Sequence, residues 1–291
     1  MAKIEHSGFV MKISGEALSS DGELSSEGLS KIAKILSSNL TQEEKSVQVN
    51  AILLKYYKRP CITKDKVNLI CDDIIKIHEA GKSIAVVSGA GNIWRGRQFG
   101  DFDKVNADYI GMQAININSH AIYLGLKDRG YEVYFTTKLF VDGIVERFVI
   151  NNVRNAFNSN VIVIVGGGTG SPGCSTDLAT TQLAFELEAD GILFGKSIDG
   201  IYSGDPRTGD AIKYDILTHE ELVASQLSQG IQTQAFMDHR AALMLGETKI
   251  NLYAYLGSDP TAIDEILRGN NPGTIVTSDP ELLAKRKIFI K

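Results

Sequence analysis

The sequence has few of the features that mark a disulfide-rich, secreted or membrane protein. Its 291 residues contain only three cysteines, Cys61, Cys71 and Cys174, with no C-x-x-C pair, so we expect reduced thiols and not disulfides. No apolar run approaches the roughly 18 to 20 residues that a bilayer-spanning helix needs. The start, MAKIEHSGFVMK, lacks the apolar core of a signal peptide. These absences predict a soluble, cytoplasmic protein without a membrane partner.

The sequence also lacks an excess of positive charge. Its 30 Lys and Arg against 35 Asp and Glu give a net charge of -5, which argues against a nucleic-acid partner held along an extended basic surface. The five histidines are scattered without the spacing of metal ligands, so we predict no metal site built by the protein. A small anion can still bind where a few cations and main-chain amides gather.

What the sequence does contain is a regular alternation of short β-branched blocks and amphipathic segments. Short strands that are apolar on both faces, with helices between them, predict a mainly parallel sheet covered on both sides. The expected fold class is therefore α/β, a three-layer α/β/α doubly wound arrangement. The expected strands are residues 9–13, 83–87, 132–135, 161–165, 191–194, 250–255 and 274–277.

Helical periodicity is clearest between residues 110 and 124. Apolar residues at positions 110, 114, 117, 121 and 124 step by fours and threes, which predicts that they form one buried helix face. Other helix signals are a periodic segment from Val67 to Ile77 before Gly81, a capping box of Thr218 with Glu221, and a helix opened by Asp259-Pro260 and ended by Gly269. Residues 37–66 break the alternation and are expected to form a surface insertion.

Glycine-containing turns follow four of the expected strands, at the strand ends where doubly wound folds bind ligands. They are Lys12-Ile13-Ser14-Gly15, Ser88-Gly89-Ala90-Gly91, the stretch GTGSPGCSTD at 168–177, and Gly195-Lys196. Glycine lets main-chain amides approach a ligand closely, and a helix that begins after the turn adds its positive end. Together the turns predict an anion-binding rim at one edge of the sheet.

Two nucleotide-binding patterns in these turns fail on physical grounds. GTGSPG has the G-x-G-x-x-G spacing of dinucleotide-binding turns, but the acids about twenty residues later, Glu188 and Asp190, precede the next strand instead of following it. Pro172 also lies inside the turn, so we disfavour an NAD site. DGILFGKS at 190–197 resembles a P-loop, but its interior consists of bulky strand residues that cannot wrap around a phosphate.

With the turns placed, the sequence resembles the amino acid kinase family, and within it the bacterial-type uridylate (UMP) kinases. The matching stretches are KISGEAL (12–18), GAGNIWRG (89–96), ADYIGMQA (107–114), GTGSPGCSTD (168–177) and DGIYSGDP (199–206). They occur in the family's order and span most of the chain. Five ordered motifs are more specific than any single glycine pattern.

The resemblance implies transfer of a phosphoryl group from Mg-ATP to UMP, giving UDP and ADP, with ATP and Mg²⁺ as cofactors. It also implies a homohexamer with GTP and UTP as effectors, built from a single domain of residues 1–291 with an acceptor-binding N-terminal half and an ATP-binding C-terminal half. The implied catalytic residues are Lys12, Arg95 and Asp177. The implied ATP-binding residues are Lys12, Ile13, Ser14, Gly15, Gly91, Arg95, Lys196, Tyr202 and Asp205. The implied UMP-binding residues are Ala90, Asp108, Thr169, Gly170, Ser171, Pro172, Gly173, Cys174, Ser175 and Thr176.

The implied chemistry agrees with the residues at the rim. Phosphoryl transfer depends mostly on positioning and charge neutralisation, so cations and amides suffice without a nucleophilic side chain. Two of the carboxylates also have a structural interpretation. Asp108 could be an N-terminal charge or cap of its helix, and Thr176 or Asp177 could cap the helix that follows the turn.

Several positions depart from the family's usual pattern. The family usually has asparagine where Ser171 stands, glycine where Ala90 stands and two aromatic residues where Gly173 and Cys174 stand, and it places a lysine earlier than Lys196. The loss of two rings enlarges the acceptor turn. Two alternatives therefore stay open: an enzyme of this fold that phosphorylates a carboxylate or carbamate, or a non-catalytic nucleotide-binding storage or regulatory protein.

Overall fold

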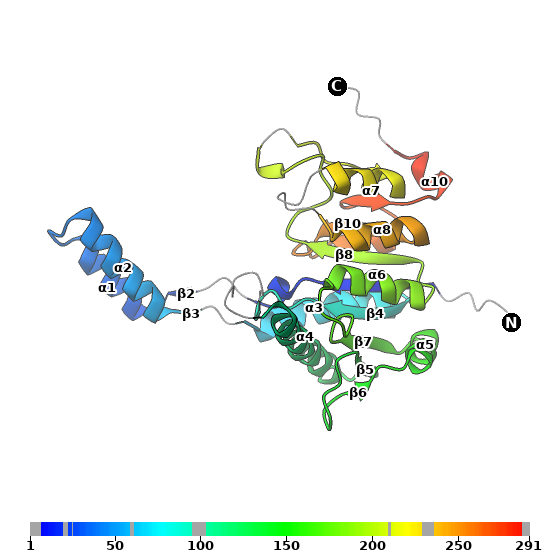
Figure 1. The fold of residues 1–291 in the computed structure, drawn as a ribbon, viewed down its shortest axis with the longest axis horizontal. Coiled ribbons are helices and arrows are strands. Elements are labelled where there is room, and N and C mark those ends of the chain that lie inside the picture. Colours follow the sequence, from blue (N-terminus) through cyan, green and yellow to red (C-terminus); the bar gives the residue numbers. More distant parts are fainter. Residues whose placement is uncertain are drawn as a thin grey trace.

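A nine-stranded sheet forms the centre of the molecule (Figure 1), which we describe from a computed structural model. The structure describes residues 7–19, 23–24, 26–58, 61–94, 103–208, 211–228 and 236–286. The strand order is β6-β5-β7-β4-β1-β8-β10-β11-β9, and every pairing is parallel except that of β10 with β11. The strands are β1 (Gly8–Ile13), β4 (Ser83–Ser88), β5 (Val133–Thr137), β6 (Glu146–Arg147), β7 (Ile162–Gly166), β8 (Gly191–Lys196), β9 (Ile216–Leu217), β10 (Asn251–Leu256) and β11 (Thr274–Val276).

Helices cover both faces of this sheet, which confirms the predicted fold class. Alternate residues of a strand point to opposite faces, so Val10 of β1 lies in one core cluster and its neighbour Met11 in the other. The first cluster includes residues of α5 (Ile150–Asn158), α6 (Thr176–Glu186), α7 (His219–Ser228) and α8 (His239–Thr248). The second includes residues of α3 (Lys64–Glu79), α4 (Lys104–Lys127) and α9 (Ala262–Leu267). A short α10 (Pro280–Leu283) follows the last strand.

All seven strands expected from the sequence are present, with ends shifted by at most a few residues. The capping box is confirmed as well: the amide of Thr218 donates to Glu221 at 2.9 Å, and the amide of Glu221 donates to the Thr218 hydroxyl at 3.1 Å. The unexpected strands β2 (Glu23–Leu24), β3 (Tyr57–Lys58), β6 and β9 have two residues each, too few for an alternating hydrophobic pattern.

The predicted buried face of α4 is only partly correct: Ala114 is 3% exposed and Ala121 packs against a core cluster, but the three larger apolar residues are exposed. Ile110, Ile117 and Leu124 are 38%, 53% and 50% exposed, although the helix itself forms as expected. The helix is apolar on two sides, and the side that meets the sheet carries other residues, including Met112 and Ile122. Periodicity alone cannot decide which of two apolar faces is buried when both have the spacing of a helix.

The insertion expected at 37–66 is a helical hairpin with different limits. Helices α1 (Ser26–Leu36) and α2 (Gln42–Tyr56) pack on each other, and the antiparallel pair β2–β3 closes the hairpin at its base. Residues 64–66 belong to α3 instead, where Thr63 is the N-cap. Figure 1 shows the hairpin projecting away from the sheet. Of the helices within the described ranges, none is long and apolar enough to cross a membrane.

Candidate active site

The expected rim is built where parallel strands end at one edge of the sheet. The amide of Gly89, after β4, donates to the carbonyl of Ile13 at the end of β1 at 2.8 Å. A Cβ atom on Gly15 would lie 2.5 Å from the amide nitrogen of Gly91. The turns after β1 and β4 are therefore packed main chain against main chain, and only glycine fits at their contact.

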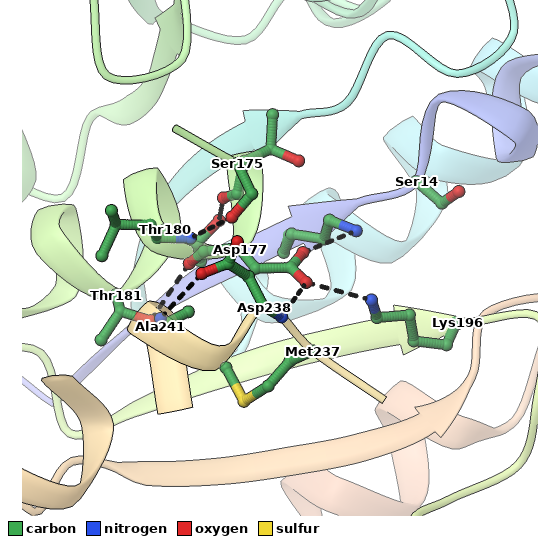
Figure 2. Close-up of polar contacts among 12 residues, drawn as sticks. Ser14, Ser175, Asp177, Thr180, Thr181, Lys196, Met237, Asp238 and Ala241 are labelled. Atoms are coloured by element: carbon green, nitrogen blue, oxygen red, sulfur yellow. Dashed lines mark hydrogen bonds and ion pairs between the residues drawn. The ribbon is translucent and has the colours of Figure 1, made fainter. Parts of the chain in front are cut away.

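A cluster of the buried Lys12 and Asp177 with the partly buried Lys196 lies beside these turns. Lys12 is near the end of β1, Lys196 ends β8, which pairs with β1, and Asp177 is in the first turn of α6. Lys12 Nζ is 3.2 Å from Asp177 Oδ1, and Lys196 Nζ is 3.4 Å from Asp177 Oδ2. Figure 2 shows Lys196 pointing toward Asp177. Two cations thus share one carboxylate.

The protonation of the cluster follows from burial and these charges. Burial raises the pKa of Asp177, but the positive charges of Lys12 and Lys196 outweigh that effect and hold it below its ordinary value. For Lys196, burial lowers the pKa to about 8; Asp177 opposes this change and the charge of Lys12 adds to it. Asp177 is therefore ionised at neutral pH, and Lys196 is charged but close to the pH at which it loses its proton.

Asp238 joins this cluster through its main chain, a contact that no sequence pattern predicted. Its amide donates to Asp177 Oδ2 at 3.2 Å, as Figure 2 shows. Its side chain caps α8 by accepting from the amides of Arg240 at 2.8 Å and Ala241 at 3.2 Å. A D-x-x pattern before a helix could have indicated the cap, but a main-chain contact to a distant carboxylate leaves no trace in the sequence.

The turn of residues 169–176, for which the resemblance implies acceptor binding, is attached to Asp108. The amide of Gly173 donates to Asp108 Oδ2 at 2.6 Å, and the guanidinium of Arg240 donates to the carbonyl of Gly173. Gly173 has a φ of +76°, a conformation that a residue with a side chain rarely adopts. Two charged side chains, Asp108 and Arg240, therefore hold the main chain at Gly173. Arg240 was also missed by the sequence analysis.

The structural interpretations of the two carboxylates are wrong. The N-cap of α4 is Asp103, which accepts from the amide of Asn106 at 3.0 Å, and Asp108 lies one turn further along the helix. The N-cap of α6 is Ser175, which accepts from the amide of Leu178 at 3.2 Å. Neither Asp108 nor Asp177 is the N-cap of its helix.

The rest of the turn of residues 169–176 includes hydrogen bonds between its own neighbouring residues. Thr169 Oγ1 donates to the carbonyl of Ser171 at 3.0 Å and accepts from the amide of Ser171 at 3.2 Å. Gly170 has a φ of +75° and lies against the carbonyl of Lys138. Pro172 and Cys174 are partly or largely exposed, while Thr176 begins α6.

The other described residues that the resemblance implies for nucleotide binding do not belong to the cluster of Lys12, Asp177 and Lys196. Ser14 donates to the carboxylate of Glu16, and that carboxylate lies against Gly91, so Glu16 fills the space between the first two turns. Tyr202 donates to Asp199 at 2.6 Å, and Asp205 forms an ion pair with Arg207 at 2.6 Å. Ala90 is in the turn after β4. Arg95 lies outside the residues that the structure describes.

Comparison with known proteins identifies the family. Residues 61–253 match the amino acid kinase family. The uridylate kinase of Mycoplasma mobile is 32% identical over 238 residues, which cover 77% of this chain and 96% of that protein. A uridylate kinase of Streptococcus thermophilus is 33% identical over 220 residues, covering 74% of this chain and 87% of that protein. The chain belongs to the amino acid kinase family.

Within that family, its relatives are uridylate kinases, so the resemblance inferred from the five motifs is confirmed. Solved structures agree on the fold. The UMP kinase from Bacillus anthracis has a TM-score of 0.75 at 24% identity, with 94% of this chain and 97% of that chain covered. The UMP kinase from Ureaplasma parvum has a TM-score of 0.73 at 27% identity, with 94% and 100% covered.

Proposed function

We propose that this protein transfers the γ-phosphoryl group of Mg-ATP to UMP, giving UDP and ADP. The observation that carries the proposal is the cluster of Lys12, Asp177 and Lys196 at the ends of two adjacent parallel strands, beside glycine turns and the start of α6. Such a place favours a polyphosphate, because ammonium groups, main-chain amides and a helix N-terminus all attract negative charge. The name of the similar proteins, uridylate kinase, supplies the acceptor.

On the donor side, Lys12 and Lys196 would neutralise charge on the phosphates of ATP. Asp177 would orient the two lysines, since each of its oxygens already meets one ammonium group. We propose that the main chain of residues 13–15 and Gly91 lines the phosphates, with Arg95 near the transferred group. Tyr202 and Asp205 would line the rest of the ATP pocket. The C-terminal half of the single domain would thus bind ATP and the N-terminal half the acceptor.

On the acceptor side, Asp108 would accept hydrogen bonds from the ribose hydroxyls of UMP. A carboxylate accepts several hydrogen bonds, and the one from Gly173 at 2.6 Å uses only part of this capacity. The turn of residues 169–176, with Ala90 across the rim, would enclose the nucleotide. In this arrangement the Gly173 contact fixes the turn and the carboxylate at once.

Mg²⁺ would be held mainly by the phosphates of ATP. In the part of the chain that the structure describes, no three His, Cys, Asp or Glu side chains gather as a metal site. Asp177, the carboxylate of the cluster, is engaged by two ammonium groups and an amide. Mg²⁺ commonly binds through substrate phosphates and water with few protein ligands, and it would supply charge neutralisation at the transferred group.

We also propose a cytoplasmic homo-oligomer, a homohexamer by the family resemblance, with GTP and UTP as effectors. The apolar residues Ile110, Ile117 and Leu124 support the assembly, because they recur every seven residues along α4 and are all exposed in the single chain. An exposed apolar stripe of this kind is typical of a subunit interface. Sedimentation of the purified protein tests the oligomeric state.

The decisive experiment measures ADP release with UMP, CMP, aspartate, acetylglutamate and carbamate in parallel. We expect turnover with UMP and little with the others. The glycine at position 173 favours a second candidate, an enzyme of this fold with a different acceptor, because the turn lacks the aromatic pair. Turnover with a carboxylate or carbamate alone would establish that alternative. ATP binding without turnover on any acceptor would indicate a storage or regulatory protein.

A further inference from the structure

Two aromatic rings lie against the lysines of the cluster. Lys12 Nζ is 5.1 Å from the centroid of the Phe194 ring, and Lys196 Nζ is 4.5 Å from the same centroid. Lys196 Nζ is also 5.3 Å from the centroid of the Phe236 ring. The two rings contact each other, with centroids 5.6 Å apart and planes tilted by 46°. Both ammonium groups are thus within the range of a cation–π contact.

The rings come from the segments that also build the cluster. Phe194 precedes Lys196 by two residues on β8, so the two side chains point to the same face of the sheet. Phe236 precedes Asp238 by two residues, and the amide of Asp238 bonds to Asp177. Phe194 is fully buried and Phe236 nearly so. Their positions are therefore fixed by the core together with the lysines.

The charge balance of the cluster explains what the rings add. Lys12 and Lys196 share the single carboxylate of Asp177, so the group carries one net positive charge in a largely buried place, with the Lys196 side chain 20% exposed. A buried charge without compensation is unfavourable. A second carboxylate would compensate it but would also cancel the attraction for phosphates. The face of an aromatic ring stabilises a cation and leaves its charge in place.

We propose that Phe194 and Phe236 form an aromatic seat that keeps Lys12 and Lys196 charged and in position at the phosphate site. In this role they are positioning residues that act through the lysines and do not touch the reacting atoms. The inference rests on the proposed function only where it says that the lysines meet the phosphates of ATP. The electrostatic effect itself is a property of the protein alone.

Titration of the Lys196 side chain by NMR of its ε-methylene group tests the proposal without any substrate, and the Lys196→Arg variant identifies the resonance. Among the residues that the structure describes, the charged groups that act on Lys196 are Asp177 of α6 and Lys12 of β1, and both stay in place in the variants. In Phe194→Leu, which keeps an apolar side chain, we expect the pKa of Lys196 to fall by about one unit, the size of a desolvated cation–π contact. Phe236→Leu, which removes the more distant ring, should produce a smaller fall in the same direction.

Phe157→Leu is the matched control, because Phe157 is equally buried in the same core cluster on α5. It should lower the melting temperature much as Phe194→Leu does and leave the pKa of Lys196 unchanged. If Phe194→Leu is too unstable to titrate, Phe194→Met, which retains more of the volume, replaces it. An unchanged Lys196 pKa in the folded Phe194 and Phe236 variants would overturn the proposal.

Kinetics separate this inference from the proposed function. If the protein phosphorylates UMP, Phe194→Leu should raise the KM for ATP several-fold at pH 8 and change the KM for UMP little. If the protein uses another acceptor, the NMR result still stands or fails by itself. A purely structural role for Phe194 would lower stability and leave both the titration and the ratio of the two KM values unchanged.

Discussion

Asp177 Oδ1 lies 3.2 Å from Lys12 Nζ, although the two residues belong to α6 and β1 and are far apart in the sequence. The contact sets the first turn of a helix against the end of a central strand. Breaking it from either side leaves a buried charge with fewer partners.

Replacing Lys12 should impair catalysis much more than folding. In Lys12→Ala we expect turnover to fall about 10²-fold or more, the scale observed when one charge-stabilising group is lost from an active site. Steady-state kinetics and circular dichroism of the same preparation check both parts. The control is Lys76→Ala, which removes a lysine paired with Asp73 and Asp264 on α3 and α9. Near-normal turnover in Lys12→Ala would remove the basis of the mechanism.

The pH dependence of ATP use should report Lys196. Because burial lowers its pKa to about 8, Lys196 is charged below that pH and neutral above it. We expect kcat/KM for ATP, which reports ionisation in the unliganded enzyme, to decline above about pH 8. Lys196→Arg should keep its activity constant to higher pH, because arginine remains charged. The same alkaline decline in both proteins would rule out Lys196 as its source.

Deprotonation of Lys196 should raise the stability of the protein with pH, whereas it lowers the use of ATP. Its pKa is about 8 in the folded protein, against the ordinary lysine value of 10.5, so between these pH values the unfolded chain binds more protons. Stability therefore rises with pH across this window. Chemical denaturation at pH 7.5 to 10, compared with Lys196→Met, isolates the contribution. We expect the variant to lose this rise, and an identical pH profile would contradict the assignment.

Asp108 should act on the acceptor and not on ATP. In Asp108→Ala we expect the KM for UMP to rise at least about tenfold, the scale of a lost hydrogen bond to a charged group. The KM for ATP should change little. Asp103→Ala is the control, because it removes the true N-cap of α4 and should cost about 1 kcal/mol of stability without changing the KM for UMP. Equal effects on both substrates would argue for a structural role of Asp108.

Arg240 should tighten the acceptor turn. Arg240→Ala removes the donor to the carbonyl of Gly173, so we expect a several-fold higher KM for UMP and an unchanged KM for ATP. Arg240→Lys should restore part of the loss, because lysine can still donate one hydrogen bond. Arg268→Ala, which breaks an exposed ion pair with Glu265, serves as the control. An unchanged KM for UMP would show that the turn holds its shape without Arg240.

The helical hairpin should be removable. Leu24 and Tyr57 pair directly across β2 and β3, so a two-residue Asn-Gly turn can replace residues 25–56 and close the two strands. We expect the shortened protein to retain its melting temperature and its ATP KM, because the sheet and its two core clusters lie elsewhere. Calorimetry and kinetics test this. A loss of folding would show that the hairpin supports the body of the protein.

The sequence predicted the features that repeat or that depend on local geometry. Strands such as 83–87 and 161–165 were recognisable because they are buried on both faces and stay apolar throughout. The capping box at Thr218 was recognisable because its two partners are three residues apart. The turns at Gly15 and Gly91 stood out because close packing of main chain requires glycine.

The missed features depend on contacts between distant segments. Nothing local marks Asp238 or Arg240 as neighbours of Asp177 and Gly173, since these contacts exist only once α8 is packed beside α6. Three of the five residues predicted on the buried face of α4 are exposed, because both apolar faces of the helix have helical spacing. The hairpin was expected as an insertion, but its helices could not be delimited, because a polar stretch gives weak periodicity.

The N-terminal end of α8 reaches both substrates' proposed sites at once. The amide of Asp238 donates to the Asp177 carboxylate, which lies between the two lysines. Two residues later, Arg240 donates to the carbonyl of Gly173, in the turn that Asp108 also binds. A shift of this helix end would therefore displace the Asp177 contact on the ATP side and the Gly173 contact on the acceptor side together. Residues 238–240 thus connect the proposed ATP site to the proposed acceptor site.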